Sequence, residues 1–96
     1  MTDPKLVLIE WEDSHSPVGW QQIDGTFEDR ALVCRSVGWL MLDGERAKVL
    51  APHLNTAESG VPLQGSGIIT IPVGAVLRVV PLTETIPQVS AEPTAS

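Results

Sequence analysis

Two apolar runs separated by a very short connection stand out along the chain, at residues 67–72 and 76–81. Both are rich in β-branched side chains, which favour β-strands. Pro72 ends the first run, because proline has no N–H to donate to a sheet ladder. The connection is too short for a helical crossover. It predicts a turn of 3₁₀ character, the closing device of small SH3-like barrels.

Alternation of apolar and polar positions predicts three further strands. Residues 5–12 alternate with a period of two, and residues 31–42 form the longest apolar stretch. Within that stretch, Gly38 predicts a bend or bulge. Asp43-Gly44 then lies between apolar runs, which is a strong hairpin signal, and leads into a strand over residues 46–51.

These five strands predict an all-β fold, a small five-stranded SH3-like or Sm-like barrel that forms a single domain over residues 1–82. Turn-forming residues predict a long first loop over residues 13–30 and a second loop over residues 52–66. Residues 83–96 offer little apolar surface to offset chain entropy. We therefore expect residues 83–96 to be a disordered, flexible tail.

Charge and cysteine content narrow the possible partners and location. Twelve acidic and six basic residues give a formal net charge of −6, which disfavours general binding to nucleic acids. A single cysteine, Cys34, rules out an internal disulfide and is expected to fill a small core position. The sequence contains no apolar run of membrane-spanning length and no secretory-signal pattern. We therefore expect a cytoplasmic protein.

The strand patterns also predict which side chains face the core of the barrel and which face solvent. The side chains expected to form the core are Val7, Ile9, Val49 and Val79, with Trp11 and Trp39. The aliphatic side chains on the opposite faces are Leu6, Leu8, Leu50 and Val80. A monomer would leave the second set in water, so we expect the chain to form a homo-oligomer.

Short motifs follow one another in a defined order along residues 5–82. They are Trp11-x-Asp13, Trp20, Cys34-x-Ser36-Val37-Gly38-Trp39, Ala51-Pro52-His53, Gly67, Ile71-Pro72 and Val79-Val80-Pro81-Leu82. In order and spacing these motifs resemble a family of small proteins encoded in tailed-phage and prophage genomes. The resemblance implies a phage or prophage origin and leaves the activity open. The chain departs from the family pattern at Ser66, where cysteine is frequent, and at Val73, where a basic residue is frequent.

Patterns that would support catalysis or metal binding are weak. Residues 10–13 hold three acids but lack the ligand spacing of a calcium loop. Cys34 and the two histidines lack the spacing of zinc ligands. Ser14-His15 lies in no nucleophile elbow, and no phosphate-cradling glycine loop is found. We therefore expect no enzyme activity, no cofactor and no bound metal.

A ligand site is predicted from residue types that are unusual in their surroundings. Trp20 lies in a polar loop, where its ring must dock on the barrel, a partner or a ligand. Arg35 interrupts an apolar strand, and it either pairs with Glu10 or Glu12 or captures an anion. The predicted ligand-binding residues are Trp20, Arg35, Arg78, His15 and Asp13.

Two function classes are compatible with this sequence. The first is a non-enzymatic binding module that counters host defence by sequestering a nucleotide signal or a host protein, with Trp20 stacking on a small anionic ligand. The second is a structural or assembly protein of the virion. Extended nucleic acid and membranes are not expected as partners of either.

Overall fold

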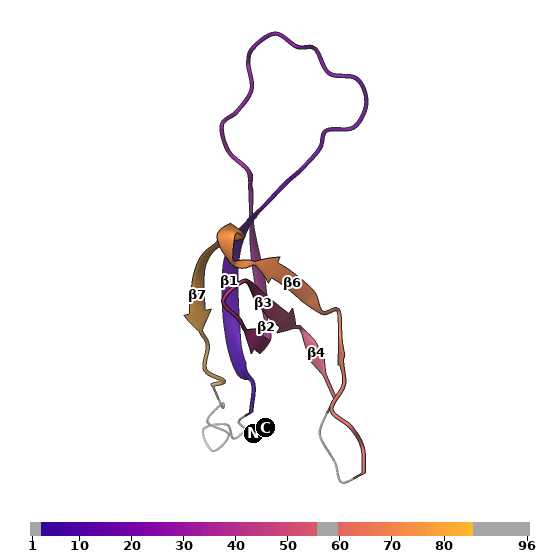
Figure 1. Cartoon of the computed structure of the whole chain (residues 1–96), viewed down its shortest axis with the longest axis vertical. Helices are drawn as coiled ribbons and strands as arrows, with labels where there is room; N and C mark the ends of the chain where they lie inside the picture. Colours follow the sequence, from indigo (N-terminus) through magenta and orange to yellow (C-terminus); the bar gives the residue numbers. More distant parts are fainter. Residues whose placement is uncertain (1–2, 56–59, 86–96) are drawn as a thin grey trace, which may run out of the picture.

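The computed structural model describes residues 3–55 and 60–85, and the chain is all-β over these residues (Figure 1). Five strands form one antiparallel sheet in the order β6-β3-β2-β1-β7, and two short strands, β4 and β5, form a separate pair. Within the described residues the sheet does not close into a barrel, because β6 and β7 are its two edges. The elements are β1 (Lys5–Asp13), β2 (Leu32–Asp43), β3 (Ala47–Ala51), β4 (His53–Leu54), β5 (Gly65–Ser66), β6 (Ile69–Pro72), the 3₁₀ turn η1 (Val73–Ala75) and β7 (Val76–Pro81).

The predicted strands are confirmed with small shifts of their bounds, and so is the 3₁₀ turn between β6 and β7. In that turn the Val76 N–H donates to the Val73 carbonyl. Prolines lie at two strand ends, since β6 stops at Pro72 as predicted and β3 stops before Pro52. The pair β4–β5 falls inside the predicted second loop. Strands of two residues carry too little periodicity to predict.

A small apolar core lies on one side of the sheet, the inner face. Its buried members are Val7, Ile9, Leu50 and Ile71, and Trp11 and Val79 pack against them. The prediction for Val7 and Ile9 is confirmed, whereas the prediction that Leu50 lies outside and Val49 inside is wrong. Leu50 pairs with Leu40, and Val49 pairs with Leu42, so Leu50 takes the inward position.

A register shift explains that error. The pairing of β2 with β3 shifts between Leu40 and Leu42, so Met41 is an extra residue that alters the alternation along β2. The bulge was expected at Gly38, which instead marks a close approach of two backbones. A Cβ atom on Gly38 would lie 2.7 Å from the Ala51 carbonyl oxygen. Only glycine leaves room for the backbone of β3 at Ala51 to lie this close to β2.

The opposite side of β2, β1 and β7 is open, and we call it the outer face. Its side chains form rows across the three strands, because directly paired residues of antiparallel strands point the same way. Val37, Leu8 and Val80 form one row, and Trp39 and Leu6 lie in the next. Trp39 is therefore half-buried on the outer face and not in the core, because the alternation of β2 places it opposite to Gly38. The outer face comprises Leu6, Leu8, Glu10, Glu12, Val33, Arg35, Val37, Trp39, Arg78 and Val80.

The predicted flexible tail over residues 83–96 lies largely outside the described residues, which end at residue 85. No helix in the described part of the chain has the length and apolar character needed to cross a membrane.

Candidate functional site

The most prominent feature of the molecule is the long connection between β1 and β2, residues 14–31, which we call the arm. Figure 1 shows the arm as a wide open loop that projects beyond the ends of β1 and β2. The chain measures 62 × 40 × 24 Å along its principal axes. The sequence prediction of a long first loop is confirmed, and the structure adds that this loop stands clear of the sheet.

The arm exposes large apolar side chains to solvent. The relative accessibility of Trp20 is 103%, so no other described part of the chain covers its ring, which borders a hollow of the arm together with Phe27. Exposed apolar groups of this size are costly when they gather on one segment, and in soluble proteins they mark binding surfaces. The other large apolar side chains exposed on the arm are Val18, Ile23 and Phe27.

Local contacts shape the arm without covering these side chains. Gly19 and Gly25 have positive φ angles of 88° and 85°, which permit two bends of the chain. Between them, Asp24 accepts a hydrogen bond from the Thr26 N–H at 3.0 Å and another from the Thr26 hydroxyl. The hydroxyl bond is the main cause that lowers the pKa of the Asp24 carboxyl, which is therefore ionised at neutral pH.

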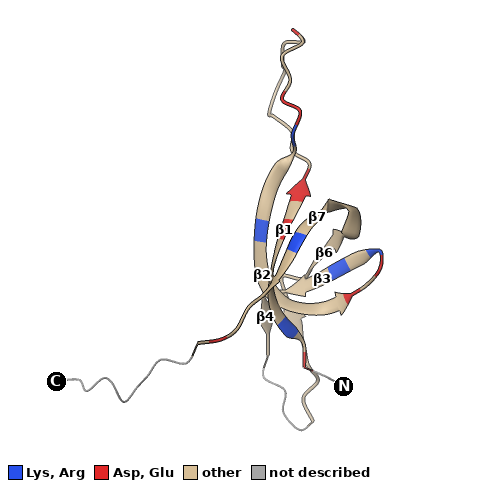
Figure 2. Cartoon of the chain, turned by 90° about the vertical axis from the view of Figure 1, so that its left-hand side faces the viewer, with Lys and Arg blue, Asp and Glu red and all other residues tan. Residues whose placement is uncertain are grey.

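A second feature is a row of charges across the outer face. Glu10 on β1 pairs with Arg35 on β2 and with Arg78 on β7. Arg78 Nε donates to Glu10 Oε1 at 2.8 Å, and Arg35 Nε lies 3.2 Å from Glu10 Oε2. Figure 2 shows basic bands on β2 and β7 on either side of acidic bands on β1. One carboxylate thus joins three strands and leaves the row with a net positive charge.

These contacts favour the ionised form of Glu10. The hydrogen bond from Arg78 is the main cause that holds the Glu10 pKa below its ordinary value of 4.5, and the charges of both arginines add to it. The same hydrogen bond raises the pKa of Arg78. A carboxyl whose pKa is lower in the folded state than in the unfolded state stabilises the fold at pH values above its unfolded-state pKa. This stabilisation is lost as the pH falls through the folded-state pKa of the carboxyl.

Substitution of Glu10 tests this row. We expect Glu10→Gln to lower the melting temperature at pH 7, because two arginines are left without their shared anion. The difference from the wild type should shrink as the pH falls through the lowered pKa of Glu10, because Glu10 itself then becomes protonated. Thermal melts between pH 7 and pH 3 measure both effects. Glu12→Gln is the control, since Glu12 makes no ion pair in the described part of the chain. A constant difference at all pH values would contradict the assignment.

Two of the predicted ligand residues lie at the base of the arm. Asp13 is the last residue of β1 and pairs with Leu32, and its side chain is half-buried. His15 lines a cavity of about 330 Å³ together with Glu12, Glu28 and Arg30. Arg30 Nε is 3.1 Å from Glu28 Oε2, so the cation here is already neutralised. The cavity therefore offers no unpaired positive charge to an anion.

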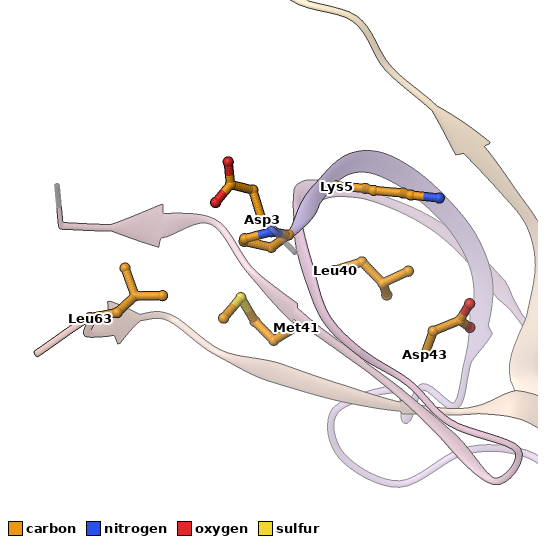
Figure 3. A pocket seen from close by; sticks show the side chains of 7 residues that line it. Asp3, Lys5, Leu40, Met41, Asp43 and Leu63 are labelled. Carbon is orange, nitrogen blue, oxygen red and sulfur yellow. The ribbon is translucent and has the colours of Figure 1, made fainter. Parts of the chain in front are cut away.

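Another cavity, of about 380 Å³, opens between the start of β1 and the β2–β3 hairpin (Figure 3). Leu40, Met41 and Leu63 supply its apolar lining. Figure 3 shows Lys5 and Asp43 on one side of it and Asp3 on another. The cavity thus combines an apolar lining with the charged groups of Asp3, Lys5 and Asp43.

The structure brings together only part of the predicted site. Arg35 and Arg78 meet at Glu10, which confirms the alternative in which Arg35 pairs with a carboxylate of the first strand. Trp20 does not join them, and the full exposure of its ring contradicts one of the three alternatives given for it, docking on its own barrel. The physical reason is that the arm extends away from the sheet (Figure 1), and Trp20 on the arm is fully exposed. Stacking by Trp20 beside an arginine therefore does not occur within one chain.

Sequence reasoning missed the role of Arg78 and the breadth of the apolar arm. Arg78 pairs with Glu10 because β7 lies beside β1, which local patterns do not reveal. The composition of the arm is typical of a polar loop, although the arm contains Val18, Ile23 and Phe27. These three residues are too widely spaced to show the periodicity of a strand or a helix.

Across the described residues, no three His, Cys, Asp or Glu side chains gather in a geometry that could hold a metal ion. His15, His53 and Cys34 lie on the arm, on β4 and on β2 respectively. Comparison with known proteins finds no match to a protein-family model, to a curated protein or to a solved structure.

Proposed function

We propose that this chain is a non-enzymatic binding protein of phage or prophage origin that acts as a homo-oligomer and uses the arm as its binding element. The observation that carries the proposal is the arm itself, which holds Trp20 and three further apolar side chains in solvent. Ordering such a segment is unfavourable unless a partner covers it, and aromatic anchors are typical of protein interfaces.

The scaffold is suited to this role. The 3₁₀ turn between β6 and β7 and the five-stranded antiparallel sheet support an SH3-like arrangement, a fold that serves many binding functions. In this proposal the protein works in the host cytoplasm, and its target is a host protein or a nucleotide signal of host defence. A nucleotide would have to bind between copies, because Trp20 and the two arginines of the outer face stand apart within one chain.

A role in virion assembly is the second candidate. The arm projects well beyond the sheet (Figure 1), which is a geometry suited to linking neighbouring subunits. The two candidates differ in what accompanies the purified protein. A sequestering protein is expected to carry a nucleotide that absorbs at 260 nm beyond its three tryptophans, whereas an assembly protein is expected to form large, ligand-free particles.

Replacement of Trp20 tests the proposed function. We expect Trp20→Ala to leave the free energy of unfolding of one subunit within about 0.5 kcal/mol of the wild type, because the ring packs on nothing in its own chain. Self-association should weaken strongly, since an exposed aromatic ring is removed from the interface. Sedimentation at micromolar concentration measures the mass against the 10.3 kDa of one chain.

Trp11→Ala is the matched control. Trp11 packs against the core and its Nε1 donates to Ser36 Oγ at 3.1 Å, so its removal should cost about 3 kcal/mol of stability. A wild-type mass equal to one chain, or an unchanged mass after Trp20→Ala, would contradict the proposed function.

A further inference from the structure

Two apolar surfaces of this chain lack a cover among the described residues. One is the arm, with Trp20, Ile23 and Phe27 in solvent. The other is the outer face, where Val37 has a relative accessibility of 50% and lies in a row with Leu8 and Val80. Both surfaces are apolar, so contact between them would remove both from water.

The two surfaces do not meet within one chain. The arm leaves the sheet at Asp13 and returns at Leu32, and Figure 1 shows it extending away from the strands. The full exposure of Trp20 confirms that the ring reaches no strand of its own chain. Contact between the arm and an outer face therefore requires a second copy.

Charge favours the same pairing. The arm carries three acids, Asp24, Glu28 and Asp29, and one arginine, Arg30, which gives it a net charge of −2 with histidine neutral. The Arg35–Glu10–Arg78 row carries two positive charges and one negative. Among the ion pairs of the described residues, this row is the place where cations outnumber acids. Glu12 lies beyond the row on the same face, so the positive charge is local to the two arginines. In a protein of net charge −6, such a row is where an acidic segment of another copy would be attracted.

We propose that the arm of one copy docks on the outer face of a second copy, with its apolar side chains on the row of Val37, Leu8 and Val80 and with Asp24 facing the Arg35–Glu10–Arg78 row. This inference rests on the proposed function and adds the acceptor surface. Asp24 is suited to the contact because it lies between Ile23 and Gly25 at the turn of the arm, next to an apolar side chain that would be buried.

The apolar part of the contact is tested at Val37. Val37→Lys places a charge in the proposed interface. We expect it to raise the dissociation constant of the oligomer at least about tenfold, which is the size of effect expected when one buried contact is lost. Leu77→Lys is the matched control, because Leu77 is exposed to 51% but is the extra residue of the bulge between β7 and β1 and takes no part in the rows. Its dissociation constant should stay within about twofold of the wild type.

The polar part is tested by charge exchange between the two surfaces. Arg35→Glu and Asp24→Arg should each weaken self-association, because each sets like charges against each other. The chain that carries both changes should recover part of the lost affinity, since the attraction is restored with reversed signs.

Complementation between variants provides the decisive experiment. Trp20→Ala keeps an intact outer face, and Val37→Lys keeps an intact arm. An equimolar mixture should therefore associate more tightly than either variant alone. Sedimentation or native mass spectrometry measures the mass of the assemblies in the mixture and in each variant.

Several results would overturn the inference. If Trp20→Ala dissociates the oligomer and Val37→Lys does not, the arm docks elsewhere, and the proposed function stands without this acceptor. If Val37→Lys lowers the melting temperature with no change in mass, a segment of the same chain covers the face. A monomeric wild type would remove the inference and the proposed function together.

Discussion

Leu50→Ala is expected to lower the free energy of unfolding by about 2–5 kcal/mol. Leu50 has a relative accessibility of 1% and lies in the core with Ile9 and Ile71, so its truncation leaves a cavity that the small core cannot fill. Equilibrium unfolding in urea, followed by tryptophan fluorescence, measures the change. A loss of this size is a large share of the total stability of so small a domain.

Leu42→Ala is the matched control, because it makes the same leucine-to-alanine change in the same hairpin. Leu42 is 53% exposed and pairs with Val49 on the other side of the sheet, so its truncation should cost less than about 1 kcal/mol. Equal losses for the two variants would mean that the alternation of β2 and β3 differs from the one described.

Gly38→Ala is expected to destabilise the chain by about 1–3 kcal/mol or more. The added Cβ atom would lie 2.7 Å from the Ala51 oxygen and 2.9 Å from the Ala51 carbonyl carbon. These neighbours are backbone atoms, so relief requires β3 to move away from β2 at the point where both border the core. Thermal and urea unfolding give the measurement.

Gly74→Ala serves as the comparison. Gly74 lies in η1, its added Cβ would meet nothing within 4 Å, and its φ angle is not positive. The substitution should be neutral or stabilise by up to about 1 kcal/mol, through the lower entropy of the unfolded chain. If Gly38→Ala proved equally harmless, the close approach of β2 and β3 would be refuted.

Local patterns in the sequence were sufficient for the strands and the turns. Pro52 and Pro72 end strands by lacking a donor, and Asp43-Gly44 starts the tight connection in which the Gly44 N–H donates to the Ala47 carbonyl. Each of these effects acts within a few residues. They therefore predict where elements begin and end, and not how elements pair.

Features that depend on how the strands pair could not be predicted from local sequence patterns. Leu50 and Val49 exchange faces because of one extra residue at Met41, and an extra residue in a ladder leaves no mark in the local alternation. Barrel closure depends likewise on the meeting of two edges, and β6 and β7 do not meet within the described residues.

The candidate site divides in the same way. Arg35 is an isolated cation in an apolar run, and that contrast predicted either a pair with Glu10 or Glu12 or capture of an anion, of which the structure shows the pair with Glu10. Arg78 and Glu10 meet only because β7 adds to the far side of β1. Trp20 was recognised as unusual from its polar neighbours, but its full exposure depends on the path of the arm through space.

The strand order has a consequence for the kinetics of folding. β2 and β3 are joined by a short turn, whereas β1 pairs with β2 across the whole arm and with β7 across nearly all of the described chain. The β2–β3 hairpin is thus the pairing that can form early, because it closes the smallest loop. β7 must emerge before the second edge of β1 can be paired, so a chain still being synthesised carries β1 with free N–H and C=O groups along that edge. Sheet completion is then limited by long-range loop closure, and folding should be slow for a chain of this length.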